Sequence, residues 1–156
     1  KLPDSQLDRF LLRLSMGYPS PAEELELLRR RQYGHGMDGA AQVVDRASLE
    51  QMRQAAGNVH VSEEIMKYII SLVGATRKHP QLLQGASPRA TLAVTAVSRS
   101  VAFLRGRDYV VPEDVQTIWV DAVAHRLLMV PGAERTTDPK EIARTVLRTV
   151  EAPRVR

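Results

Sequence analysis

The chain has 156 residues, enough for one domain with its own core, and it has no cysteine, which excludes disulfides, thiolate metal sites and cysteine nucleophiles. Its formal net charge is +4 and its pI about 9.8, but 22 basic residues are interspersed with 18 acidic ones, so charge alone identifies no partner. No apolar run approaches about 18 residues and no signal peptide is visible, so we expect a cytoplasmic protein with no membrane contact.

The amino-terminal stretch is predicted to be a helix followed by a strand. Residues 2–10 favour one or two helical turns, because Pro3 and Asp4 suit the first turn of a helix. Residues 10–16 have the pattern of a short strand, which Gly17 ends.

The next segments are a helix, a loop and a second helix. Residues 20–31 open with a capping-box pattern formed by Ser20 and Glu23, with a proline between them, so we expect a helix there. Residues 33–39 contain three glycines and are predicted to form a loop. A helix over 47–56 follows.

Helical periodicity dominates the rest of the chain. Ser62 is predicted to cap a helix over 63–78, and further helices are predicted over 112–129 and 138–150. The clearest helix follows Ser87. Its apolar residues recur at three- and four-residue spacing and predict a buried stripe formed by Ala90, Ala93, Val94, Val97, Val101 and Leu104.

These elements indicate an all-α protein, a helical bundle with very little strand. The only strands expected are the short one at the amino end and a tiny two-stranded pairing between residues 59–61 and 109–111.

The sequence contains no complete catalytic site that pattern and spacing can identify. It has no phosphate-binding G-x-x-x-x-G-K-[ST] loop and no paired Asp-Glu that would hold magnesium. Its four histidines lack the spacing of metal ligands, so no metal site is predicted. We therefore expect the chain alone to be inactive as an enzyme.

Arg89 is the first candidate functional residue, because it lies at the start of the helix that Ser87 caps and Pro88 opens. The amino end of a helix carries a partial positive charge and favours anions, so a cation there is electrostatically misplaced. One interpretation is a solvated arginine that pairs with a nearby glutamate. The other is a phosphate site, formed by the free N–H groups and a guanidinium.

Other arginines are weighed in the same way. Arg9, in "LDRF", is either a surface arginine at the end of a short helix or an arginine finger that reaches a phosphoryl group on a neighbouring subunit. Pairing of charges at helix ends accounts for Arg77, Arg105, Arg107 and Arg126, and His125 with Arg126 is expected to be a packed and solvated pair. Trp119 lies on an apolar stripe and is expected in the core.

Several segments, in order, resemble the carboxyl-terminal portion of the MoxR family of AAA+ ATPases. "LPDSQLDRFLLRLSMGYPSPAEELELL" is similar to the segment that leads out of the ATPase core. "VHVSEEIMKYIISLVGATRKHP", "GASPRATLAV", "LRGRDYVVPEDV" and "HRLLM" are similar to the helical lid. The resemblance covers roughly residues 2–130, and its domain boundaries would be 1–18 for the tail of the core and 19–156 for the lid.

The resemblance implies a chaperone-like ATPase that matures or assembles partner complexes and binds ATP between core and lid. Arg89 would be the sensor 2 arginine, with Ser87 and Pro88 beside the ATP phosphates, and Arg9 would be the arginine finger, acting in trans. Magnesium would be held by the core, whose phosphate loop and acidic pair this chain lacks. The implied partners are the core of the same polypeptide, neighbouring subunits of a homo-oligomeric ring of the hexamer type, and von Willebrand factor A domain proteins.

Two alternatives remain at this stage. A free-standing basic helical module could bind nucleic acid, but such a module should gather its arginines on one helix face, whereas here they lie at helix ends. A purely structural bundle could bind a protein partner without any affinity for phosphate.

Overall fold

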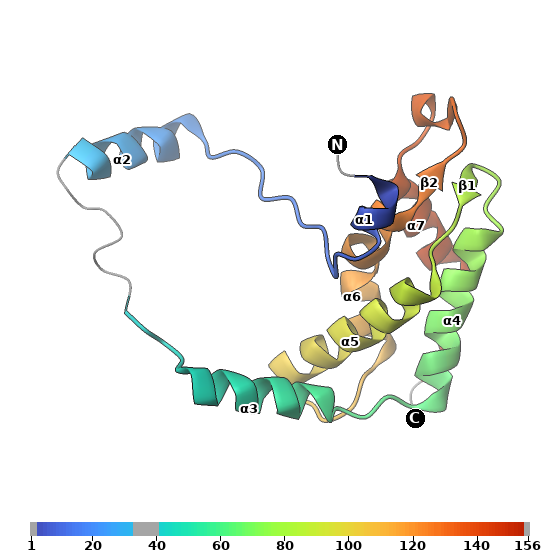
Figure 1. Cartoon of the computed structure of the whole chain (residues 1–156), viewed down its shortest axis with the longest axis horizontal. Helices are drawn as coiled ribbons and strands as arrows, with labels where there is room; N and C mark the ends of the chain where they lie inside the picture. The colour runs from blue at the N-terminus through green and yellow to red at the C-terminus, as the bar shows by residue number, and fades with distance from the viewer. Residues whose placement is uncertain (1–2, 33–40, 155–156) are drawn as a thin grey trace. The chain divides into compact units, whose positions relative to one another are not determined.

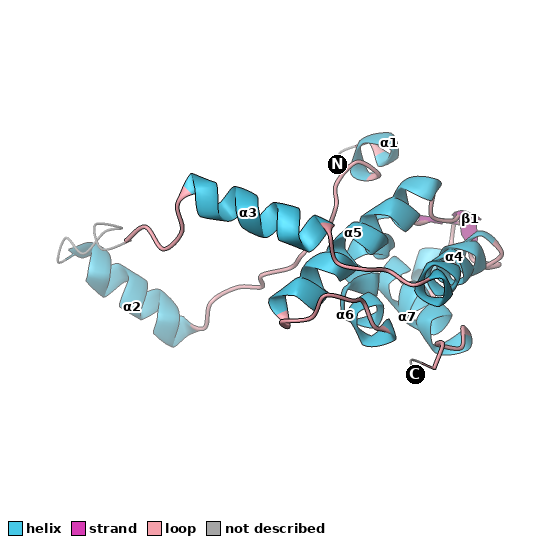
Figure 2. Ribbon diagram, turned by 90° about the horizontal axis from the view of Figure 1, so that it is seen from below, coloured by secondary structure: helices cyan, strands magenta, loops and turns pink. Residues whose placement is uncertain are grey.

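The computed structural model describes residues 3–32 and 41–154. The chain divides into two compact units, one of residues 1–13 and 53–156 and the other of residues 14–52. Figure 1 shows the order of the elements, and Figure 2 shows that helices account for most of the secondary structure, which confirms the all-α class. The loop predicted over 33–39 lies outside the described residues.

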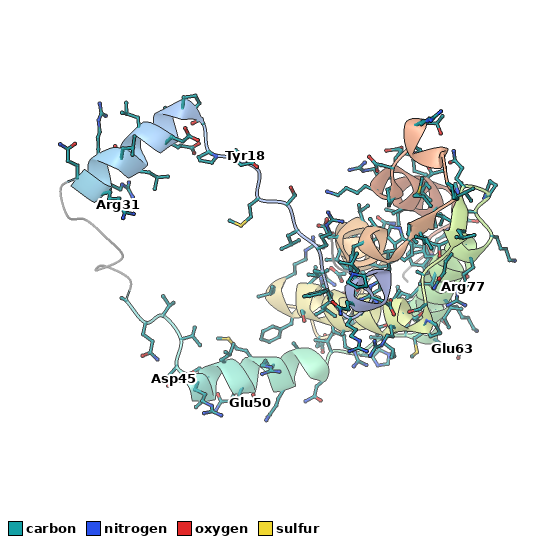
Figure 3. The ribbon with its side chains drawn as sticks, turned by 45° about the horizontal axis from the view of Figure 1, so that its top comes forward. Tyr18, Arg31, Asp45, Glu50, Glu63 and Arg77 are labelled. Carbon is teal, nitrogen blue, oxygen red and sulfur yellow. The ribbon has the colours of Figure 1, made fainter. Side chains whose placement is uncertain are left out.

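The elements are, in chain order, α1 (Asp4–Leu7), α2 (Pro21–Gln32), α3 (Arg46–Gly57), α4 (Glu63–Arg77), β1 (Leu82–Gln84), α5 (Pro88–Leu104), α6 (Pro112–Val123), a 3-10 helix (Ala124–Arg126), β2 (Leu128–Met129), a second 3-10 helix (Ala133–Arg135) and α7 (Pro139–Thr149). Glu63 and Arg77 mark the two ends of α4 in Figure 3.

Helix α2, in the unit of residues 14–52, begins with the capping box that the sequence predicts. The backbone N–H and the hydroxyl of Ser20 both donate to Glu23 Oε2 at 2.7 Å, and the Glu23 N–H donates back to Ser20 Oγ at 3.4 Å. No residue of α2 is buried. Local capping, rather than core packing, therefore explains where this helix starts.

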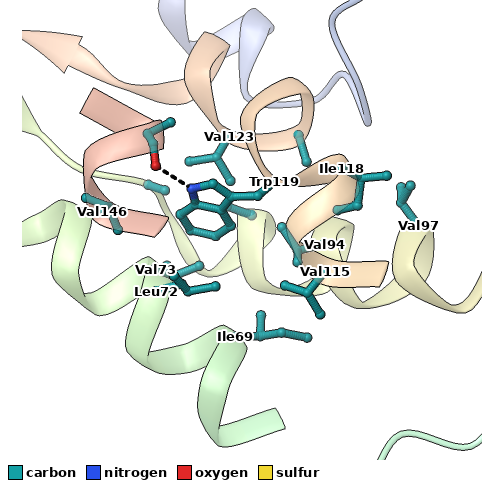
Figure 4. Packing of buried hydrophobic residues seen from close by; sticks show 14 of the residues in the cluster. Ile69, Leu72, Val73, Val94, Val97, Val115, Ile118, Trp119, Val123 and Val146 are labelled. Atoms are coloured by element: carbon teal, nitrogen blue, oxygen red, sulfur yellow. Dashed lines mark hydrogen bonds between the residues drawn. The ribbon is translucent and has the colours of Figure 1, made fainter. Parts of the chain in front are cut away.

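The core of the other unit is built by α4, α5, α6 and α7 around Trp119 (Figure 4). The indole is fully buried, and its Nε1 donates a hydrogen bond of 2.9 Å to the Ala143 carbonyl on α7. Such a bond satisfies the one polar group that a buried tryptophan brings into the core. The expectation that Trp119 is a core residue is confirmed.

The strand predicted over residues 10–16 is wrong, since no strand is assigned there. A strand needs a neighbouring strand to take its hydrogen bonds, and no described residue forms such a ladder with this segment. Its polar groups bond elsewhere instead. The Arg13 N–H donates to the Asp121 carbonyl at 2.9 Å, and the Phe10 carbonyl accepts from side chains described below.

The helix predicted over 112–129 ends at Val123, because the chain then tightens into the 3-10 helix and extends into β2. Strand β2 pairs antiparallel with β1, with Leu82 opposite Met129. The expected pairing of 59–61 with 109–111 is reduced to one parallel bridge, between His60 and Tyr109.

The stripe predicted on α5 is also wrong at its end. Ala90, Ala93, Val94 and Val97 are buried, whereas Leu104, in the last turn, is 82% exposed.

Candidate functional site

The start of α5 is fastened to the end of α4 by the loop that precedes it. A Cβ on Gly85 would lie 2.6 Å from the backbone of Arg77, so only glycine permits this approach. The Ala86 N–H donates to Thr76 Oγ1 at 3.0 Å, and Arg77 Nε donates to the Ala86 carbonyl at 2.9 Å. The first turn of α5 is therefore held in place against the end of α4.

Ser87 caps α5 as the sequence predicts, and Pro88 occupies its first turn. Ser87 Oγ accepts the Arg89 N–H at 3.2 Å. The same hydroxyl lies 3.0 Å from both carboxylate oxygens of Asp8, toward which it donates. One hydroxyl thus joins the start of α5 to the segment that carries Arg9.

Asp8 also forms an ion pair with Arg126, whose Nη1 lies 3.2 Å from Asp8 Oδ1. The Arg126 side chain is only 2% exposed and that of Asp8 is 24% exposed. The Phe10 carbonyl accepts two further hydrogen bonds, from Arg126 Nη2 at 2.7 Å and from His125 Nε2 at 3.0 Å. The expectation that His125 and Arg126 are packed is confirmed, but the expectation that they are solvated is wrong, since both side chains are enclosed and bind the amino-terminal segment.

Burial shifts the pKa values of the two side chains, His125 and Arg126, that bind the amino-terminal segment. Burial lowers the pKa of His125, and the neighbouring charges of Arg126 and Arg13 lower it further, which favours the neutral ring that donates from Nε2. Burial also lowers the pKa of Arg126, with a smaller contribution from the charge of Arg89, while Asp8 opposes the shift. A guanidinium stays protonated in proteins, so Arg126 remains the cation that Asp8 neutralises.

Arg9 and Arg89 are both exposed, and their side chains line the same open pocket together with Asp8, Leu92 and Arg126. Within residues 3–32 and 41–154, neither guanidinium has a hydrogen bond or an ion pair. The four residues that the sequence singles out, Ser87, Pro88, Arg89 and Arg9, thus lie in one region of one chain.

The sequence reasoning missed Asp8 and the buried state of Arg126. These two residues are 118 positions apart, so no local spacing could link them. The sequence marks Arg126 only as one of several arginines near the ends of predicted helices and gives no sign of its partner.

The remaining helix-end arginines have structural partners. Arg105 and Arg107 both bind Asp114, whose side chain is fully buried. Burial alone would raise the pKa of Asp114, but hydrogen bonds from Arg107 and the Val111 N–H, with the charges of both arginines, lower it. The expectation of charge pairing is confirmed for these two.

Comparisons with known proteins show which proteins this chain is similar to. Residues 74–145 match the family described as the AAA lid domain. The chain is 38% identical to "Chaperone MoxR1" of Mycobacterium tuberculosis, over 99% of this chain and 43% of that protein. It is 34% identical to "Uncharacterized protein YeaC" of Bacillus subtilis (97% of this chain, 48% of that protein) and 30% identical to "Protein MoxR" of Methylorubrum extorquens (98% and 51%).

A solved structure is similar over nearly the whole chain. The crystal structure of a candidate ATPase from Cytophaga hutchinsonii superposes with a TM-score of 0.89 at 32% identity, covering 99% of this chain and 50% of that one. The chain spans about half the length of the relatives it matches.

The helical bundle and the match over residues 74–145 define an AAA lid domain. With its relatives, the chain belongs to the MoxR family of AAA+ proteins. Among the described residues, no helix combines the length and apolar character needed to cross a bilayer.

Proposed function

We propose that this chain is the carboxyl-terminal portion of a MoxR-type ATPase, with residues 1–18 as the end of the ATP-binding core and residues 19–156 as the lid. ATP would bind between core and lid, and the core would hold Mg²⁺. Hydrolysis belongs to the longer protein, and we expect this chain alone to be inactive.

The observation that carries the proposal is the exposed guanidinium of Arg89 at the positive end of α5. The positive pole of the helix dipole favours phosphate at a helix amino end, and a guanidinium adds a full charge and a bidentate fork. Asp8, which lines the same pocket, is already paired with Arg126. A terminal phosphate of ATP would therefore fit at the start of α5, where Arg89 acts as sensor 2 with Ser87 and Pro88 beside it.

Arg9 acts as the arginine finger of a neighbouring subunit's site. Its exposure supports this role, because a finger must reach beyond its own chain. The proposal therefore includes a homo-oligomeric ring, of the hexamer type. The ATPase would act as a chaperone that matures or assembles partner complexes, with von Willebrand factor A domain proteins among its partners.

The test is ATP turnover by the ATPase that carries this chain. Arg89→Ala and Arg9→Ala are each expected to lower turnover by about 10²-fold or more, by analogy with the worth of arginine fingers. Arg135→Ala, which removes an exposed arginine from the second 3-10 helix, is the matched control and should leave turnover unchanged. Wild-type rates in both variants would refute the assignment of these two residues.

A further inference from the structure

The lid holds the residues on both sides of Arg9. Asp8, directly before it, is bound by Ser87 and Arg126, and the carbonyl of Phe10, directly after it, is bound by Arg126 and its neighbour in the 3-10 helix. The side chain of Arg9 itself has no hydrogen bond or ion pair to any described residue. The backbone that carries this guanidinium is thus fixed while the guanidinium stays available.

We propose that Asp8 is a positioning residue that sets the place of Arg9 by anchoring it to the lid, with Arg126 as its buried counter-ion. This inference rests on the proposed function of Arg9 as an arginine finger. Asp8 itself does not touch the nucleotide in this scheme, because its carboxylate is engaged by Ser87 and Arg126.

The strength of the anchor follows from burial. Arg126 is almost fully enclosed, and a buried guanidinium left without its carboxylate is strongly unfavourable. The Asp8–Arg126 pair therefore resists separation, and the backbone of the adjacent Arg9 cannot shift without breaking it. Since a misplacement of about 1 Å in a catalytic group can cost about 10²-fold in rate, this anchor is expected to matter for hydrolysis.

The anchor also joins the two candidate arginines. The Ser87 hydroxyl donates a hydrogen bond to the Asp8 carboxylate, and its oxygen accepts one from the backbone N–H of Arg89. One hydroxyl thus holds both the backbone of Arg89 and the segment that carries Arg9.

Subunit mixing distinguishes a positioning role from a general loss of stability. In a mixed ring of Arg9→Ala and Arg89→Ala subunits, some sites have an intact Arg89 and receive an intact Arg9 from the neighbour, so activity should exceed that of either parent ring. If Asp8 positions Arg9, Asp8→Asn behaves like Arg9→Ala. Activity is then restored by mixing with Arg89→Ala subunits and is not restored by mixing with Arg9→Ala subunits.

The experiment uses the whole ATPase and compares ATP turnover in pure and mixed rings. Pure Asp8→Asn rings are expected to lose about 10²-fold, whereas Asp108→Asn, which removes an exposed carboxylate in the same unit, should match the wild type. Asp8→Glu, which keeps the charge and moves the carboxylate, is expected to complement in the same way as Asp8→Asn. It serves as the second variant should Asp8→Asn not assemble.

Two results separate the possible failures. Restoration of Asp8→Asn or Asp8→Glu by Arg9→Ala subunits, or wild-type turnover in both pure rings, would overturn the positioning role of Asp8. Failure of Arg9→Ala and Arg89→Ala to complement each other would instead overturn the proposed trans action of Arg9, and this inference with it.

Discussion

Asp114 offers the sharpest test of how the lid is held together. Its buried carboxylate accepts two hydrogen bonds from Arg107, at 2.6 and 2.7 Å, one from Arg105 at 2.9 Å, and one from the Val111 N–H at 3.0 Å. These bonds join the end of α5 to the start of α6. Asp114→Asn keeps the shape of the side chain but removes its charge and turns an amide N–H₂ toward a guanidinium.

The loss of unfolding free energy caused by Asp114→Asn depends on how exposed its two arginine partners are. Breaking a buried ion pair costs about 3–5 kcal/mol. The side chains of Arg105 and Arg107 are 45% and 23% exposed, so water replaces part of what they lose and the lower end of that range applies. We therefore expect Asp114→Asn to lower the free energy of unfolding by about 3 kcal/mol, or the melting temperature by roughly 6–12 °C for a chain of this size.

Urea unfolding followed by fluorescence measures this directly, since the chain has one tryptophan and it is buried. Asp108→Asn is the control, because it removes the same charge from an exposed carboxylate. Because the folded pKa of Asp114 lies below its ordinary value, its contribution is present above the unfolded pKa of about 3.9 and is lost as the pH falls through the folded value. The difference in unfolding free energy between Asp114→Asn and the wild type should thus shrink below about pH 4. If Asp114→Asn lowers the free energy of unfolding by less than about 0.5 kcal/mol at pH 7, the buried ion pair does not stabilise the fold as argued.

Two further predictions follow from particular contacts. Gly85→Ala forces a Cβ against the backbone of Arg77 and should destabilise the chain by about 1–3 kcal/mol in urea unfolding, whereas Gly74→Ala, inside α4 with open space around it, should be neutral or stabilising. Titration with duplex DNA at two salt concentrations should give weak binding without a steep salt dependence, because Arg105, Arg107 and Arg126 are already paired with carboxylates.

The sequence was informative wherever the cause of a structure is local. Ser62 and Ser87 cap their helices through their own hydroxyls, and Asp138 accepts the N–H of Glu141 at 2.8 Å, all within three residues along the chain. Such contacts can be read from spacing alone. The positions of the helix starts, and with them the place of Arg89 on α5, were therefore predictable.

Contacts between distant segments could not be predicted in the same way. Nothing in "HRLLM" distinguishes the last turn of a helix from a 3-10 turn that leads into β2, because its apolar residues fit a buried position in either. The choice is made by β1 and by the amino-terminal segment, which lie far away in the sequence. For the same reason Asp8 was overlooked, although it precedes a residue that was singled out.

The choice of Ser87 as the cap of α5 fits the electrostatics of the pocket. Aspartate caps helices at least as well as serine and would also neutralise the positive pole of the helix. At this position, however, a second carboxylate would lie close to Asp8, whose oxygens are 3.0 Å from Ser87 Oγ, and would repel it. It would also weaken the positive potential that the Arg89 guanidinium and the helix dipole would present to a phosphate. A neutral hydroxyl caps the helix, donates to Asp8 and leaves that potential intact, so serine suits both the stability of the helix and the proposed binding of a phosphate.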